Sequence, residues 1–467
     1  MSEEQNEKLQ NGQNEEGDKP EELEDPGEFE NKSKCSKNQK IILSSILLIV
    51  IVIIIIVVIV LVSRDDSNEE EVQKNNTLKL IYYTEEEGAE LTLFSYKIIP
   101  HISSLEIDGK EKEIINNYYT FDIIGEHTIK IKLKTNFDSL SELFKYNRYL
   151  IQADFSDVIS KNINDTTQMF YACSNLISIN FQNFDTPSLV KMSEMFNGCS
   201  SLTSIDLSSL ITKNVKDMSL LFNGCYNLES IAISNFDTQN VENMQGMFSS
   251  CVSLKSLNLK KFKTSKVTNM AKMFYKCYAL NSLDISSFDT SNVFSMESMF
   301  NFCTSLESLN LENFNPSKVT DMSSMFSSCQ GMKSLKLWKT ANNLVENMNN
   351  MFHGCENLAN IELLNNIDTT NTKLMGMMFY GCESLTNLNL SFFKTPNVEN
   401  IGGIFGKCTK LQTVDIRNFE TNKLVVISNL LNEVSPAGTI YYDSKKFNET
   451  LLQYKSINGW TKKDVNK

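Results

Sequence analysis

The chain has 467 residues, with 57 acidic and 44 basic side chains and a net charge of −13 at pH 7. Because the acidic excess is concentrated before residue 78, the rest of the chain is close to neutral and offers no basic stripe for phosphates, so we expect no nucleic-acid partner. No nucleophile–base pair, phosphate loop or zinc-type spacing is present, so we expect neither an enzyme nor a cofactor or bound metal.

Residues 1–40 carry 12 acidic and 6 basic side chains and very few apolar ones. Such a composition predicts a disordered tail. Cys35 stands among lysines at the end of this tail and is a candidate for palmitoylation, with a plain free thiol as the alternative.

Residues 41–62 form an apolar run in which all residues except two serines are Ile, Leu or Val. As a helix, 22 residues span roughly 33 Å, which matches a bilayer core of about 30 Å. Four lysines precede the run (Lys32, Lys34, Lys37 and Lys40) and only Arg64 follows it closely. We therefore expect a single-pass type II membrane protein, with the N-terminus cytoplasmic and the remaining chain extracellular or lumenal.

A polar linker is expected over residues 63–77, which carry 5 acidic and 2 basic side chains. Sequons on the outer side of the membrane make Asn75, Asn164 and Asn448 candidates for glycosylation. A further sequon at Asn389 falls within a predicted strand and is the weakest of the set.

A small β domain is predicted for residues 78–134, where apolar residues recur with period two. From His127 to Lys134 the sequence places Ile129, Ile131 and Leu133 on one face and lysines on the other, as in a half-buried strand. Asp108-Gly109 between two such segments is typical of a hairpin turn.

Ten cysteines recur in a common phrase with a period of 26 residues, broken once by 27: Cys173, Cys199, Cys225, Cys251, Cys277, Cys303, Cys329, Cys355, Cys382 and Cys408. A fixed period of this size predicts a solenoid. Asn147 and Val434 occupy the same slot at either end, so about twelve units are expected over residues 135–435, followed by a C-terminal cap over 436–467.

Each unit shows two halves, which residues 284–310 illustrate. Leu-x-x-Leu-x-Leu after the cysteine predicts a short strand. Val293, Met296, Met299 and Phe300 follow a spacing that predicts a short helix with one buried face. The expected fold class is therefore an α/β solenoid of strand-plus-short-helix units with a parallel sheet, preceded by the membrane helix and the small β domain.

The phrase F-D-T-S-N-V-x-x-M-x-x-M-F-x-x-C-x-S-L-x-S-L resembles that of the BspA-like leucine-rich-repeat surface proteins, over about residues 137–435. The resemblance implies a cell-surface protein used in adhesion or ligand recognition, and it brings no catalytic residues. Three interpretations of the cysteines stay open: buried thiols bonded to a neighbouring turn, disulfides between units, or metal ligands. Asn147 in the same slot favours the first, because Asn hydrogen-bonds and forms no disulfide.

Strand residues between the inward leucines are expected to form exposed polar columns. Candidate ligand-binding residues on this face are Ser282, Asp284, Ser308, Asn310, Ser334, Lys336 and the nearby Trp338. We expect a protein or glycan ligand on the extracellular side; a solvated face without a ligand, a structural coat protein, and Trp338 as mere packing over an irregular turn are the alternatives.

Overall fold

The computed structural model describes residues 75–452 and 459–467, which belong to one compact unit, Gln73–Lys467. Within these residues no helix is long and apolar enough to cross a membrane. The expected tail with Cys35, the expected membrane helix 41–62 and most of the linker lie outside the described residues.

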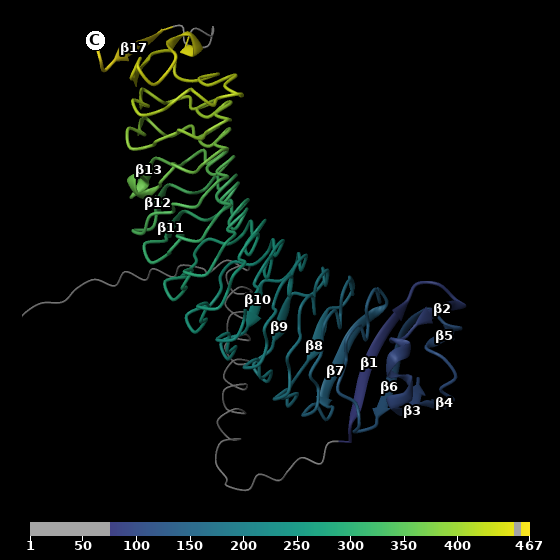
Figure 1. Cartoon of the computed structure of the whole chain (residues 1–467). Coiled ribbons are helices and arrows are strands. Elements are labelled where there is room, and N and C mark those ends of the chain that lie inside the picture. Colours follow the sequence, from purple (N-terminus) through teal and green to yellow (C-terminus); the bar gives the residue numbers. More distant parts are fainter. Residues whose placement is uncertain (1–74, 453–458) are drawn as a thin grey trace, which may run out of the picture. The chain divides into compact units, whose positions relative to one another are not determined.

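The described chain is built from short strands joined by turns (Figure 1). The N-terminal part contains β1 (Thr77–Thr84), β2 (Ala89–Thr92), η1 (Tyr96–His101), β3 (Ile102–Ile107), β4 (Lys110–Lys112), β5 (Tyr118–Phe121) and β6 (Gly125–Leu133). The repeats contain β7 (Leu150–Asp157), β8 (Ser178–Asn180), β9 (Ser204–Asp206), β10 (Ser230–Ala232), β11 (Ser308–Asn310), β12 (Ser334–Lys336), β13 (Asn360–Glu362), η2 (Leu364–Asn366), β14 (Asn387–Asn389) and β15 (Thr413–Asp415). The C-terminal part adds β16 (Gly438–Tyr442), η3 (Glu449–Leu452) and β17 (Trp460–Asp464).

The N-terminal β sheet is continuous with the first coils of the solenoid. Its strand order is β4-β3-β6-β1-β7-β8, in which β1 pairs antiparallel with both β6 and β7. Strand β7 belongs to the first coil and pairs in parallel with β8 of the second. The predicted alternation is confirmed in β6, where Ile129, Ile131 and Leu133 are buried. This sheet thereby covers the first coil, which would otherwise expose an apolar end.

The repeats form a β-solenoid of about twelve coils, as the cysteine period predicts. Parallel bridges connect one position in every coil in an unbroken ladder, from Ser139 to Val426. Bridge partners such as Asn269 and Ser295 are 26 residues apart, so side chains in equivalent slots stack on one another. Figure 1 shows the coils succeeding one another in chain order from β7 to β17.

The predicted short helix in each unit is wrong: turns replace it, and the described residues contain no α-helix. In one coil, the Met296 and Phe300 amides donate to Asp321 and Met325 carbonyls of the next coil, at 3.0 and 2.9 Å. Ser298, with a φ of 55°, interrupts any helical path between them. Because these amides serve the neighbouring coil, they are unavailable for the bonds within one segment that a helix requires.

The core position of the Met/Phe segment is nevertheless confirmed, since Val293, Met296, Met299 and Phe300 are all fully buried. Phenylalanines in the Phe300 slot form a column of stacked rings along the solenoid. The rings of Phe300 and Phe326, for example, have centroids 5.6 Å apart and planes tilted by 6°. A turn-rich coil satisfies the same apolar spacing as a helix, because both return a side chain to one face every three to four residues.

Candidate functional site

The interior columns of the solenoid are occupied by hydrogen bonds between coils. All ten repeat cysteines are free and buried, and each Sγ donates to a phenylalanine carbonyl of the preceding coil at 3.0–3.2 Å. This confirms the buried-thiol interpretation. In the same slot, the Asn147 amide nitrogen donates to the Leu93 carbonyl at 3.2 Å and its oxygen accepts from the Leu150 amide. Within the described residues no group of three or more His, Cys, Asp or Glu side chains is placed to hold a metal.

A column of buried threonines also connects neighbouring coils by hydrogen bonds. The sequence analysis did not predict this column. Thr264 Oγ1 donates to the Asp289 carbonyl at 2.9 Å and accepts from the Asp289 amide at 2.8 Å. Thr238 and Thr290 repeat this two-way bond in neighbouring coils. The threonine of the repeated F-D-T phrase was the available signal. The cysteine and threonine columns explain why these residue types recur along the repeats. Because their polar atoms are already bonded inside the protein, a ligand would have to bind an outer face.

The strand face is not uniform, because the parallel ladder of short strands is interrupted. The widest interruption lies between β10 and β11, where the coils of Ser256–Asn258 and Ser282–Asp284 contain no strand. On the opposite wall the bridges continue through the same coils. The strand edges of these coils therefore lack most of the hydrogen bonds that close the ladder elsewhere, and the Asn281 amide keeps one to the Lys255 carbonyl at 3.3 Å.

The interruption of the ladder leaves two main-chain groups without a backbone partner. Where the ladder is closed, Leu207 donates its amide hydrogen to the Ala232 carbonyl at 3.1 Å, and Leu311 donates to Lys336 at 2.8 Å. The equivalent pair at the interruption, the Ile285 amide and the Asn310 carbonyl, makes no backbone hydrogen bond in the described part of the chain. Both residues border an open surface hollow, so a donor and an acceptor of the main chain are available there.

The hollow has a volume of about 490 Å³ and lies between the coils of Ser282 and Ser308. The structure brings four of the predicted ligand-binding residues together around it: Ser282, Asp284, Ser308 and Asn310. All four are exposed. Sequence reasoning missed the rest of its lining, which includes Leu257, Leu283, Ser286, Glu312, Asn313 and Phe314. The mixture of hydroxyl, amide and carboxylate groups with a few leucines provides hydrogen bonds for orientation and a small apolar floor.

Two carboxylates give the hollow its charge. The Ser286 hydroxyl donates to Asp284 at 2.7 Å and holds the pKa of this carboxyl below its usual range, with Lys260 4.0 Å away adding to the effect. Lys336, 2.7 Å from Glu312, and Lys339 beside it lower the pKa of Glu312 to about 2. Both acids are therefore ionised at neutral pH, and Glu312 is already neutralised by lysines. Asp284 remains the main anionic acceptor at the rim.

The other predicted site residues lie in different environments. Ser334 and Lys336 occupy β12, in register with Ser308 and Asn310, and Lys336 is committed to Glu312. Trp338 is fully buried, so its prediction as a contact for a ligand is wrong. Its unit departs from the usual phrase, and the coil accommodates the change by turning the indole into the core. This outcome matches the packing alternative, and Trp338 no longer belongs to the candidate site.

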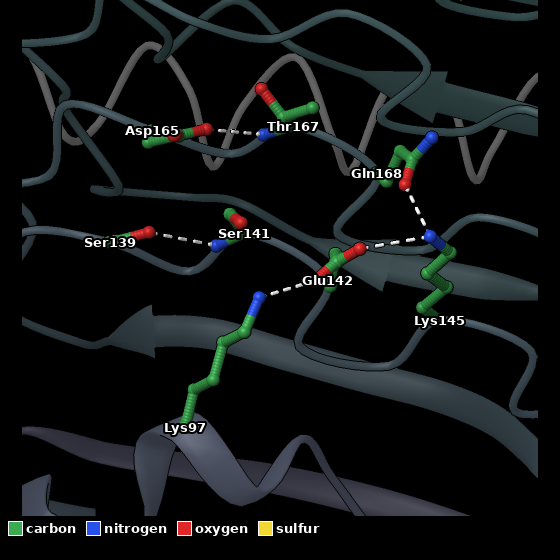
Figure 2. Close-up of polar contacts among 8 residues, drawn as sticks. All are labelled: Lys97, Ser139, Ser141, Glu142, Lys145, Asp165, Thr167 and Gln168. Carbon is green, nitrogen blue, oxygen red and sulfur yellow. Dashed lines mark hydrogen bonds and ion pairs between the residues drawn. The ribbon is translucent and has the colours of Figure 1, made fainter.

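A second polar group lies at the junction between the N-terminal sheet and the first coil (Figure 2). Glu142 contacts Lys97 of η1 and lies 2.9 Å from Lys145, whose ammonium also donates to Gln168 at 2.6 Å. Hydrogen bonds from Lys97, which has the larger effect, and from Lys145 lower the pKa of Glu142 to about 2. Figure 2 also shows the Asp165 carboxylate accepting from the Thr167 amide, at 2.9 Å. These contacts connect successive elements and are structural in character.

The predicted glycosylation residues differ in accessibility. Asn75 and Asn448 are exposed. Asn164 is half-buried, and its amide nitrogen donates to Asp138 at 3.2 Å. Attachment of a glycan to Asn164 would require this contact to open.

A family model described as "Mycoplasma protein of unknown function, DUF285" matches the sequence three times, over residues 138–257, 251–360 and 330–438. These matches together cover more than half of the chain. The chain belongs to the DUF285 family. The three overlapping matches fall within the solenoid, so the family model describes its coils.

Similarity of this DUF285 protein to other known proteins is remote. No curated protein matches its sequence. The TLR13–ssRNA13 complex is similar at 16% identity and a TM-score of 0.18, over 55% of this chain and 52% of the receptor chain. The LRR protein LIC12759 of Leptospira interrogans is similar at 13% identity and a TM-score of 0.20, over 56% of this chain and 69% of that one. The DUF285 protein thus spans about half the length of the TLR13 chain that it matches.

Proposed function

We propose that this DUF285 protein is a membrane-anchored recognition and adhesion protein, whose strand face binds a protein or glycan ligand at the hollow between Ser282 and Ser308. The observation that carries the proposal is the interrupted strand ladder, which gathers exposed polar side chains and unpaired main-chain groups around about 490 Å³. A closed ladder would present the same serines on a surface whose main chain is already bonded. The likeness of the repeat phrase to BspA-like surface proteins supports the same function.

The anchor and its orientation form part of this proposal. Residues 41–62 are apolar enough to span a bilayer, and the lysines before them favour a cytoplasmic N-terminus. In this topology the solenoid faces the outside, where a ligand on another cell or in the matrix is accessible. The exposed sequons at Asn75 and Asn448 would lie on the same side.

A binding screen of the full-length protein in detergent tests the proposed function. Purified protein would be applied to arrays of glycans and of extracellular matrix proteins, together with a triple variant, Ser282→Ala, Asp284→Asn and Ser308→Ala. We expect at least one ligand whose affinity falls about tenfold or more in this variant, since losing two or three hydrogen bonds of about 0.5–1.5 kcal/mol each is sufficient.

The repeat architecture offers a matched control in a coil pair where the ladder is closed. Ser204→Ala, Asp206→Asn and Ser230→Ala make the same chemical changes in the same slots of β9 and β10. The control should bind like the parent protein. Equal loss in both variants, or self-association without any ligand, would contradict the proposal and favour a structural coat protein.

A further inference from the structure

An aromatic cluster lies on the surface of the solenoid, where the chain turns around Cys277 and its neighbours in the adjacent coils. This corner comes just before the strand position of each coil, next to the interrupted ladder. This aromatic corner consists of Tyr226, Tyr275, Lys276, Tyr278 and Phe302. The Phe302 ring lies between two tyrosines, with centroids 6.1 Å from Tyr275 and 6.2 Å from Tyr278, both in edge contacts. Tyr226 is 52% exposed and Tyr278 37% exposed, so the cluster faces solvent.

The corner combines large residues that other coils carry singly, such as Tyr171 and Tyr380 in the Tyr275 slot and Lys407 in the Lys276 slot. The slot before the cysteine contains glycine in four coils and alanine or serine in three others: Gly198, Gly224, Gly354, Gly381, Ala172, Ser250 and Ser328. The backbone explains the glycines, because φ in this slot is positive, for example 79° at Gly198. Phe302 occupies the slot with a φ of 63°, which a bulky side chain rarely adopts. The slot also accepts other large residues at positive φ, among them Tyr146, Lys276 and Lys407. Phe302 is therefore distinguished by its ring contacts with two tyrosines and not by its backbone conformation.

Lys276 gives the corner an unpaired positive charge. Its ammonium lies 5.0 Å from the Tyr275 ring centroid and 5.9 Å from that of Phe302. A hydrogen bond with Tyr275, and the nearby Tyr278 and Tyr226 hydroxyls, raise the pKa of Lys276, so the group stays cationic. Among the described residues no ion pair with a carboxylate is formed by Lys276.

Two comparable lysines of the repeats have an acid partner. Lys145 lies over Tyr146 and Tyr171 and is paired with Glu142 at 2.9 Å. Lys407 lies over Tyr380 and 3.9 Å from Glu433. Lys276 differs from these two lysines by having aromatic partners alone, so its charge is available to a carboxylate of another molecule.

We infer that the aromatic corner is a docking surface for a protein partner that presents an acidic side chain next to an apolar or aromatic one. Exposed tyrosine and phenylalanine around a cation match the residues that dominate binding energy at protein interfaces. An Asp or Glu of the partner would pair with Lys276 while its apolar neighbour packs on Tyr278 and Phe302. This surface is additional to the strand-face hollow and does not depend on the ligand proposed there.

The test uses the full-length protein in detergent and measures its affinity for the random copolymer poly(Glu,Tyr), with poly(Glu), poly(Lys,Tyr) and a hyaluronan octasaccharide as comparison probes. The variant combines Tyr275→Ser, Lys276→Ser, Tyr278→Thr and Phe302→Gly, each a residue that other coils carry in the same slot, so the coil remains compatible with folding. Tyr118→Ser, which changes an exposed tyrosine of β5, serves as the control.

We expect the parent protein and the control to bind poly(Glu,Tyr) about tenfold or more tightly than the variant does, and more tightly than they bind poly(Glu) or poly(Lys,Tyr). The triple strand-face variant should retain this binding, which separates the corner from the hollow. Equal affinity of parent and variant for poly(Glu,Tyr) would overturn the inference. If the parent and the control bind hyaluronan and the corner variant does not, the inference would be overturned in favour of an anionic glycan.

Discussion

Cys277 Sγ lies 3.1 Å from the backbone oxygen of Phe248, in the preceding coil. The thiol fills a small buried volume and donates one weak hydrogen bond to a carbonyl that also accepts from the Cys251 amide at 3.2 Å. Burial raises the pKa of Cys277 to about 12, so the thiol is neutral at physiological pH. The same relationship repeats along the solenoid and explains why one residue type recurs every 26 positions.

Native protein should therefore resist thiol alkylation. With iodoacetamide at pH 8, followed by mass spectrometry, we expect the ten repeat cysteines to remain unmodified while the protein is folded, because the reagent needs an accessible thiolate. All ten should react after unfolding in denaturant without reductant. Thiols that stay blocked until reductant is added would show disulfides instead.

The raised thiol pKa values also predict lower stability in alkali. In the unfolded chain a cysteine ionises near pH 8.5, whereas in the folded protein Cys225 and Cys277 ionise near 12. Each such thiol therefore contributes stability that is complete below pH 8.5 and is lost as pH rises toward 12. Denaturant titrations between pH 9.5 and 11 should show a slope about 1.4 kcal/mol per pH unit smaller in Cys277→Ala than in the parent. Parallel pH curves for the two proteins would contradict this.

Thr264→Val tests the buried threonine column. Valine preserves the shape of the side chain but removes both hydrogen bonds to Asp289, leaving a partly buried amide and carbonyl without their partner. We expect the free energy of unfolding to fall by about 1–3 kcal/mol, as measured by denaturant titration. Thr268→Val, at an exposed position of the same coil, should cost much less. Similar costs for both would mean that the column adds little to stability.

The cysteine spacing, with Asn147 and Val434 in the same slot, was sufficient to predict the solenoid and its number of coils. The apolar spacing of Met296, Met299 and Phe300 was sufficient to predict that these side chains are buried. The helix was mispredicted since the spacing of Met296, Met299 and Phe300 suits a helix and a turn-rich coil equally well. Trp338 was misplaced because its unit lacks the usual phrase. The hollow was beyond prediction: Ser282 and Ser308 look like the serines in the same slot of five other coils (Ser178, Ser204, Ser230, Ser256 and Ser334), and whether a strand ladder closes depends on the spacing between coils.

Phe302→Gly separates stability from binding. Glycine adopts positive φ without the cost of about 1–2 kcal/mol that other residues pay, which offsets the loss of the partly exposed ring contacts. We expect the melting temperature of the variant to equal or exceed that of the parent, in differential scanning calorimetry. A clear drop would show that the ring contacts of Phe302 stabilise the fold by more than the positive φ costs.

The proposed topology is open to a protease experiment on intact cells. With an epitope tag at Met1, external protease should remove the solenoid and spare the tag, since the lysines before the apolar run favour a cytoplasmic N-terminus. Immunoblots for the tag and for a solenoid epitope provide the readout. Permeabilised cells serve as the control, in which both signals should disappear. A solenoid that survives in intact cells would contradict the orientation.

Hydrogen–deuterium exchange of the full-length protein, with and without the strongest ligand found on the arrays, tests the strand-face site most directly. The Ile285 amide has no backbone partner in the described structure and borders the hollow, so it should exchange quickly in the free protein. With ligand bound, we predict slower exchange in peptides covering residues 281–286 and 308–314, with β9 and β10 unchanged. Slower exchange confined to other segments would contradict the account.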